Sequence, residues 1–212
     1  MAGPITHILL ALKLFNIGML DSNTVDIKQF LVGTSFPDIR YLGVIERHKT
    51  HPAKISWNEI KNEQSSFTAG LKFHALIDQI REEFMIKNNA YELFDKNPLL
   101  SQCLKLTEDK FLYNKLNDWQ LIASLFDDIL KEELAFDITK KDIEKWHLIL
   151  KWYFSQPIKE DILVQVLQKF LPSISSKANQ LSTLAHKIEH NKTFEQLTYL
   201  FYDSFQDLLK NY

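Results

Sequence analysis

Residues 65–87 have the sequence SSFTAGLKFHALIDQIREEFMIK, in which apolar residues recur at the three- and four-residue spacing of an α-helix. Ser65 or Ser66 suits the N-cap position, and the periodic pattern continues to about Lys87. One side of this helix carries Phe73, Leu76, Ile80 and Phe84, and the adjacent side carries Phe67, Leu71, His74, Ile77, Asp78 and Arg81. Because both sides are largely apolar, we expect the helix to lie at the centre of the protein.

The use of glycine extends this interpretation to the rest of the chain. All five glycines lie at or before Gly70. A sheet protein of this size would need glycine throughout for hairpins and bulges. We therefore predict an all-α protein. Gly33 is expected to end the second helix, and Thr193 to cap the last. The other predicted helices cover residues 4–16, 25–32, 89–96, 98–105, 108–115, 117–133, 140–155, 158–170, 174–192 and 194–210.

Composition and charge describe an ordinary globular protein. The 212 residues are 45% hydrophobic and 25% charged, and no linker-like stretch divides them, so we expect one compact domain over residues 1–212. The net charge of −2 argues against a nucleic-acid partner bound by bulk positive charge. No apolar run approaches the length of a transmembrane segment, and the N-terminus makes a poor signal peptide. The single cysteine, Cys103, fits a reducing compartment, so a cytoplasmic location is expected.

Residues 34–56 form an irregular segment between the predicted helices. It contains Phe36-Pro37-Asp38, Gly43 and the sequence RHKTHP at residues 47–52. A long connection without structure of its own is often functional in a compact domain. Four of the seven histidines also fall within the first 74 residues, where all the glycines lie. This part of the chain is therefore expected to hold the functional site.

The most specific local element is the pair His74 and Asp78. Residues four apart lie on one face of a helix, so an imidazole and a carboxylate at this spacing can bind the same divalent ion, or the carboxylate can bridge two ions. A buried Asp78 needs a cationic partner. The alternative is a purely structural pair, in which Arg81, a lysine or His74 itself supplies that partner.

Other candidate ligands each have an ordinary explanation when taken singly. Asp38 is typical of a turn, His48 and His51 of a solvated loop, and His7 of a satisfied core histidine. Together, nitrogen and carboxylate ligands without thiolates suit zinc in a hydrolytic site better than zinc in a structural one. The candidate metal ligands are His7, Asp38, His51, His74 and Asp78.

The order of these motifs resembles the bacterial zinc-dependent phospholipase C family, in particular its short uncharacterised members, and more distantly the single-strand-specific zinc nucleases of the same fold. The shared pieces are Thr6-His7, Phe30-Leu31-Val32-Gly33 with Pro37-Asp38, Thr50-His51, and Gly70 with His74 and Asp78. The resemblance covers roughly residues 4–90. It implies an all-helical fold with a cluster of zinc ions that hydrolyses phosphodiesters.

The resemblance also implies roles for individual residues. Asp38, His51, His74 and Asp78 would form the first metal position, with Asp78 bridging to a second ion that His7 binds. Asp38 lies where the family has a carboxylate thought to orient or deprotonate the attacking water, so it is the expected catalytic residue. In the family the N-terminal residue completes the second position. Removal of Met1 would expose the amino group of the small residue Ala2, five residues before His7.

The family's third metal position has no direct counterpart, because no histidine lies between residues 75 and 146. His147 with His186 and His190 is the candidate substitute. Asp118-Trp119 matches a further pair in the short members and has no derived role. A phospholipase would also need an exposed apolar rim, for which Tyr41, Leu42 and Trp57 are candidates.

These observations predict a metal-dependent hydrolase of phosphodiesters or phospholipids that uses one or two zinc ions. A nuclease-like activity is an alternative that the net charge disfavours. The other alternative is a non-catalytic helical scaffold or interaction protein with an incomplete metal site. Such a protein would present a partner surface from the aromatic residues Trp146, Trp152, Tyr153, Phe154, Tyr199, Phe201, Tyr202 and Phe205.

Overall fold

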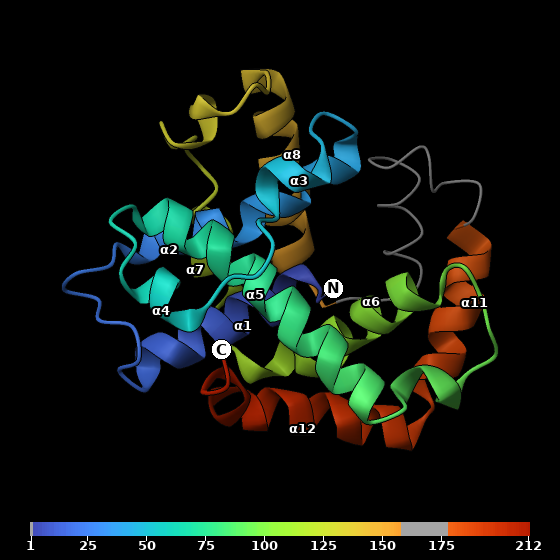
Figure 1. Ribbon diagram of the computed structural model, residues 1–212. Helices are drawn as coiled ribbons and strands as arrows, with labels where there is room; N and C mark the ends of the chain where they lie inside the picture. The colour runs from blue at the N-terminus through green and yellow to red at the C-terminus, as the bar shows by residue number, and fades with distance from the viewer. Residues whose placement is uncertain (1, 158–177) are drawn as a thin grey trace.

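The helix expected from residues 65–87 is present as α5 (Ser66–Lys87), which crosses the middle of the computed structural model (Figure 1). Its N-cap is Ser65, whose hydroxyl accepts a hydrogen bond from the backbone amide of Thr68. The structure describes residues 2–157 and 178–212. Every regular element in these two ranges is helical, which confirms the all-α prediction for the described part of the chain.

Besides α5, the described residues form further α-helices and short 3-10 helices. The described α-helices are α1 (Pro4–Asn16), α2 (Ile27–Ser35), α3 (Arg47–Thr50), α4 (Trp57–Lys61), α6 (Leu100–Leu112), α7 (Trp119–Ser124), α8 (Lys140–Phe154), α11 (Ala178–Glu189) and α12 (Lys192–Leu209). Short 3-10 helices are η1 (Phe36–Leu42), η2 (Ala90–Leu93), η3 (Tyr113–Lys115) and η4 (Glu133–Ala135).

Several predicted boundaries are wrong, each for a local reason. The helices expected at 98–105 and 108–115 are the single helix α6, because no glycine or proline separates them. The helix expected at 117–133 stops after α7, and the one expected at 89–96 is only the 3-10 turn η2. The last helix begins earlier than expected, with Asn191 rather than Thr193 as its N-cap. The predicted helix 158–170 and the start of the one at 174–192 lie outside the described residues.

The segment 34–56 is less irregular than its sequence indicates. It contains η1 directly after α2, and then the short helix α3. Gly33 does not end α2, which continues to Ser35. Asp38 therefore lies in a buried 3-10 helix that directly follows α2, rather than in an open loop.

A close crossing between α2 and α5 fixes the centre of the molecule. A Cβ atom on Gly33 would lie 2.1 Å from the carbonyl oxygen of Phe67, and one on Gly70 would lie 2.1 Å from the carbonyl oxygen of Phe30. Only residues without a Cβ allow two backbones to approach so closely. Each glycine makes room for the backbone of the other helix, and together they bring the C-terminal half of α2 against the first turns of α5.

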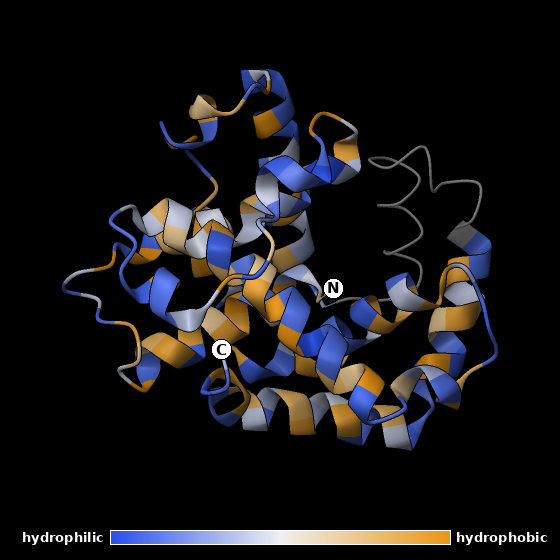
Figure 2. Cartoon of the chain, in the orientation of Figure 1, coloured by the Kyte–Doolittle hydropathy of each residue, from blue (hydrophilic) through white to orange (hydrophobic). Residues whose placement is uncertain are grey.

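One hydrophobic cluster runs from Ala2 to Leu209 and so includes both ends of the described chain. Figure 2 shows that α5 and α12 each carry both hydrophobic and hydrophilic residues. The aromatic residues proposed as a partner surface belong largely to this core. Those that are buried are Trp146, Tyr153, Phe154, Phe201 and Phe205, and those that are half-buried are Trp152, Tyr199 and Tyr202. Among the described residues, no helix has the length and apolarity needed to cross a membrane.

Candidate metal centre

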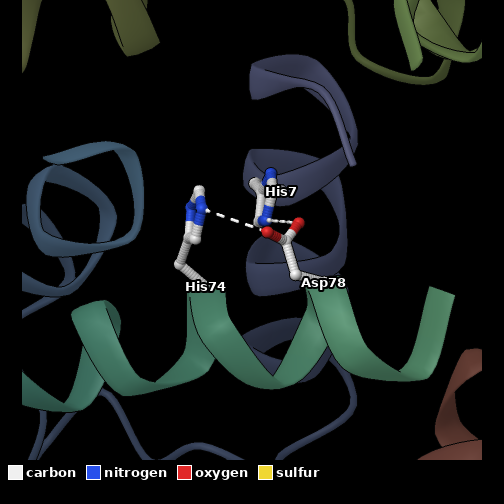
Figure 3. Close-up of side chains that lie close together, drawn as sticks. All are labelled: His7, His74 and Asp78. Carbon is white, nitrogen blue, oxygen red and sulfur yellow. Dashed lines mark ion pairs between the residues drawn. The ribbon is translucent and has the colours of Figure 1, made fainter. Parts of the chain in front are cut away.

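The i, i+4 pair on α5 faces α1. His74 and Asp78 are both buried, and their side chains project from the same side of the helix (Figure 3). The Nε2 atom of His74 lies 3.8 Å from Oδ2 of Asp78. Arg81 does not serve as the cationic partner of Asp78, because its guanidinium forms a buried ion pair with Glu108 of α6. The purely structural pairing with Arg81 considered from the sequence is therefore wrong.

His7 reaches the same carboxylate from α1. Its Nε2 atom lies 3.5 Å from Oδ1 of Asp78, and its ring is stacked parallel to that of His74 with the centroids 3.9 Å apart. His7 is not the satisfied core histidine that its sequence context would suggest, since Nε2 has no hydrogen-bond partner among the described residues. Figure 3 shows the two imidazoles next to one another, with the Asp78 carboxylate beside the His7 ring and ion pairs from both rings to it.

His51 and Asp38 complete the set from the segment after α2. The Nε2 atom of His51 lies 3.8 Å from Oδ2 of Asp78. The potential ligand atoms fall into two overlapping groups, in each of which all atoms lie within 4.8 Å of one another. One group is His7, His74 and Asp78, and the other is Asp38, His51 and His74. All five residues singled out in the sequence are thus brought together.

Each of the three histidines is oriented by a partner on its other ring nitrogen. Nδ1 of His7 lies 2.9 Å from the carbonyl oxygen of Gly3, and Nδ1 of His74 lies 2.8 Å from that of Thr34. Because a carbonyl oxygen only accepts, Nδ1 must carry the proton in both rings, which leaves a lone pair on Nε2. Nδ1 of His51 lies 3.0 Å from the Thr50 hydroxyl. This arrangement of outer partners is the one that orients metal-binding imidazoles.

The inner atoms of the cluster have no hydrogen-bond partners among the described residues. They are Nε2 of His7, His51 and His74, and Oδ2 of Asp78, all buried. Buried polar atoms of this kind are rare, because each forfeits its hydrogen bonds to water without replacement. The Nε2 atoms of three imidazoles and a carboxylate oxygen that converge in this way fit a divalent metal cation.

The electrostatics of the cluster favour the forms that bind a metal. Burial lowers the pKa of His51 to about 4 and that of His74 to about 3, so both rings are neutral at pH 7. Burial would raise the pKa of Asp78, but the neighbouring histidines and the Ala2 amide outweigh it, and this pKa lies below its usual value. Neutral imidazoles and ionised carboxylates are the states that coordinate zinc.

Two cationic side chains lie near Asp38, one from α6 and one from its own segment. Lys105 of α6 is buried and donates a hydrogen bond to the Tyr41 hydroxyl, and Arg40 has Nη2 3.5 Å from Oδ1 of Asp38. Burial would raise the pKa of Asp38, but Lys105 and Arg40 hold it below the usual range. Lys105 comes from a helix more than sixty residues away, so no local motif could have revealed it.

The backbone nitrogen of Ala2 donates a 2.7 Å hydrogen bond to Oδ1 of Asp78. The chain therefore brings the nitrogen of residue 2 to the same carboxylate that His7, His51 and His74 face. The sequence placed this residue near His7 only through the family resemblance. The contact spans 76 positions in the chain.

The other histidines do not join the cluster. His48 is exposed on α3. His147 is buried with Nε2 2.8 Å from Oε1 of Glu133, while Nδ1 of His190 lies 2.8 Å from the His186 carbonyl oxygen. Among the described residues, His147, His186 and His190 form no group that could hold a metal, so the predicted third position is not found there.

The remaining sequence candidates have structural roles. Asp118 caps α7, and the Trp119 ring stacks between Tyr113 and Phe154. Trp57 is buried and Tyr41 and Leu42 are half-buried, so these three do not form an exposed apolar rim.

A cavity of about 600 Å³ adjoins the cluster at His51 and Asp78. Its other lining residues are Arg47, Pro52, Ala53, Lys54, Ala75, Gln79, Glu82 and Glu83. Four of these side chains are charged, and none is a large apolar one. The cavity therefore gives a polar ligand access to the edge of the cluster.

Comparison with protein-family models, with curated proteins and with solved structures gave no match.

Proposed function

We propose that this protein is a metal-dependent phosphodiester hydrolase of the kind represented by the zinc-dependent phospholipase C family. The observation that carries the proposal is the convergence of three unpaired Nε2 atoms on the two oxygens of the buried Asp78. A cluster of this composition binds zinc, and zinc at such a site lowers the pKa of a bound water and stabilises negative charge on phosphoryl oxygens.

His74 and Asp78 differ in how many metal ions each can bind. Nε2 of His74 has a single lone pair, so it can serve only one ion although it belongs to both groups of potential ligands. Asp78 has two oxygens, of which Oδ1 faces His7 and Oδ2 faces His51 and His74. Asp78 is therefore the residue suited to bridge two metal positions, as the family resemblance implies.

Asp38 is the residue we assign to the attacking water. Lys105 and Arg40 keep its carboxylate ionised, so Asp38 can accept a hydrogen bond from a water and orient it. The nitrogen of residue 2 is a further candidate ligand, because it already lies 2.7 Å from Asp78. As a backbone amide this nitrogen donates to Asp78, and it would coordinate a metal only as a free amine.

The lining of the adjoining cavity favours a diester with a polar substituent over a bilayer lipid. Arg47 and Lys54 supply positive charge for an anionic phosphate, and Glu82 and Glu83 border the same space. No large apolar side chain among the lining residues is available to hold an acyl chain. We expect a small water-soluble phosphodiester to be a better substrate than a phospholipid in a vesicle.

The first test is the zinc content of protein purified without chelator, beside Asp78→Asn. This substitution preserves shape but removes the charge and one oxygen acceptor. We expect up to two zinc ions per chain in the wild type, fewer than one in the variant, and hydrolysis of bis(4-nitrophenyl) phosphate by the wild type alone.

The matched control is Glu133→Gln, which alters another buried carboxylate that accepts from a histidine and from a backbone amide. It should keep its zinc. Folded wild-type protein that takes up no zinc at micromolar concentration would contradict the proposal. Zinc binding without turnover of any diester would favour the alternative, a helical scaffold that retains a metal site.

A further inference from the structure

The first turn of α1 is capped by a side chain from a different helix. Its own N-cap residue, Gly3, has no side chain to accept from the free amides of the helix start. Those amides donate instead to Asp109 of α6, from Ile5 to Oδ2 at 3.1 Å and from Thr6 to Oδ1 at 2.8 Å. The Thr6 hydroxyl adds a third hydrogen bond, to Oδ1 at 2.7 Å.

Asp109 is itself tightly enclosed. It is completely buried, and Oδ2 also accepts a 2.8 Å hydrogen bond from the Tyr153 hydroxyl of α8. A Cβ atom on Gly3 would lie 2.2 Å from Oδ2, so the carboxylate occupies the space that any larger residue at position 3 would need. Three helices and a glycine are thus arranged around one carboxylate.

Asp109 packs against Gly3, the residue that orients His7, the candidate metal ligand of α1. The Gly3 carbonyl oxygen accepts from both the backbone amide and the Nδ1 atom of His7. One residue earlier, the Ala2 nitrogen contacts Asp78. The Gly3–Thr6 turn therefore sets the direction of two groups that face Asp78, the His7 ring and the nitrogen of residue 2.

We propose that Asp109 is a positioning residue of the metal centre, which holds the start of α1 so that His7 and the nitrogen of residue 2 both face Asp78. This inference rests on the proposed function. Asp109 should act only on the group of ligands that contains His7. The other group, Asp38, His51 and His74, lies on η1, at the end of α3 and on α5, and Asp109 forms no hydrogen bond with any of these three described residues. Loss of Asp109 should therefore affect the metal position that uses His7 and spare the other.

The test is Asp109→Asn, measured in two ways. Zinc titration should show one retained position of wild-type affinity and one weakened about tenfold, the lower end of the effect of removing a direct outer partner of a metal ligand, because Asp109 acts on His7 through Gly3. In metal-free protein, hydrogen–deuterium exchange of the peptide covering residues 2–14 should become faster. Glu133→Gln is the control, expected to keep both zinc positions and the wild-type exchange of that peptide.

Gly3→Ala disturbs the same contact by changing Gly3 instead of Asp109. The backbone at position 3 has φ −90°, which alanine adopts freely, so only the clash with Asp109 is introduced. It should reproduce the loss of one zinc position without any change of charge. It also replaces Asp109→Asn as the test if that variant does not fold.

The outcomes separate this inference from the proposed function. A folded Asp109→Asn protein that keeps both positions at wild-type affinity, or that loses both equally, overturns the role of Asp109 and leaves the metal centre intact in the wild type. A wild type without zinc overturns the proposed function, and the exchange of metal-free protein then decides about Asp109 alone. Unchanged exchange of residues 2–14 would overturn the anchoring in that case.

Discussion

At the scale of single residues, the cluster combines oriented rings with unused inner atoms. Three histidines have their Nδ1 atoms engaged by Gly3, Thr34 and Thr50, while their Nε2 atoms lack hydrogen bonds among the described residues. An unpaired buried polar atom costs about 1–3 kcal/mol. Several such atoms in one place destabilise the metal-free fold, and a bound cation would remove that cost. The arrangement is therefore better explained by binding than by packing.

Thr50 offers a direct test of the ring orientation, because it is the one outer partner that is a side chain. Thr50→Val keeps the buried shape and removes the hydroxyl 3.0 Å from Nδ1 of His51. The ring is then free to turn, so we expect zinc affinity at the position that uses His51 to fall about tenfold. Stability of the metal-free protein should fall by about 1–3 kcal/mol, because Nδ1 loses its partner. Competition with a chromophoric chelator measures the first effect and urea unfolding the second.

The matched control for this change is Thr50→Ser, which retains the hydroxyl and removes only a methyl group. It should bind zinc as the wild type does. Equal zinc affinity in the valine and serine variants would show that the hydroxyl does not orient His51.

At the scale of elements, the crossing of α2 and α5 places the His74 ring. Gly33 and Gly70 allow the backbones to touch, and the contact brings the Thr34 carbonyl oxygen to Nδ1 of His74. Replacing glycine by alanine inside a helix ordinarily stabilises a protein by about 1 kcal/mol. At these two positions we expect alanine to destabilise the protein instead, because each new Cβ would lie 2.1 Å from a carbonyl oxygen of the facing helix.

We therefore expect Gly70→Ala to destabilise the protein by about 3 kcal/mol, at the upper end of overpacking effects. Gly33→Ala should cost a similar amount. The double variant should cost less than the two together, since both act on one crossing. Urea unfolding measures all three, and a Gly70→Ala protein as stable as the wild type would show that the helices can separate without loss.

The sequence predicted those elements whose signals are local. The period of residues 65–87 predicted α5, and the four-residue spacing correctly placed His74 and Asp78 on one face. The interpretation of Gly33 as a helix end was wrong because this glycine serves a contact with another helix, which no local pattern reveals. The roles of Asp109 and Lys105 could not be predicted for the same reason, since these residues bond Thr6 and Tyr41, more than sixty positions away in the chain. The type of ligand that each side chain offers, rather than periodicity, grouped His7 and Asp38 with the pair on α5, and the family resemblance supported that grouping.

At the scale of the whole molecule, the polar centre should make stability depend on pH. The folded protein keeps His51 and His74 neutral, with pKa values of about 4 and about 3 against an ordinary 6.5, because burial disfavours their charged forms. The unfolded chain therefore binds more protons than the folded one from pH 6.5 down to these values. Stability is fully present above pH 6.5 and is lost as the pH falls through this window.

One buried carboxyl opposes this trend. Burial raises the pKa of Asp109 from 3.8 to about 6, despite the hydrogen bonds that it accepts from Thr6, Tyr153 and Ile5. Between these two values the folded state binds the extra proton, so this group alone would make the protein more stable as the pH falls. The two histidines are shifted further than this one carboxyl, so the net effect should still be a loss of stability in acid.

We predict that metal-free protein loses stability steadily between pH 6.5 and pH 4, by an amount on the order of a few kcal/mol, as each unit of pKa shift is worth about 1.4 kcal/mol. His74→Gln removes the group with the lower of the two histidine pKa values and should make the dependence shallower. Saturating zinc should make it steeper, because protons then compete with the metal for the same Nε2 atoms. Urea unfolding at pH 7, 5.5 and 4.5 measures all three cases. If the stability of the metal-free wild type stays constant or increases as the pH falls from 6.5 to 4, the buried imidazoles must accept protons in the folded state.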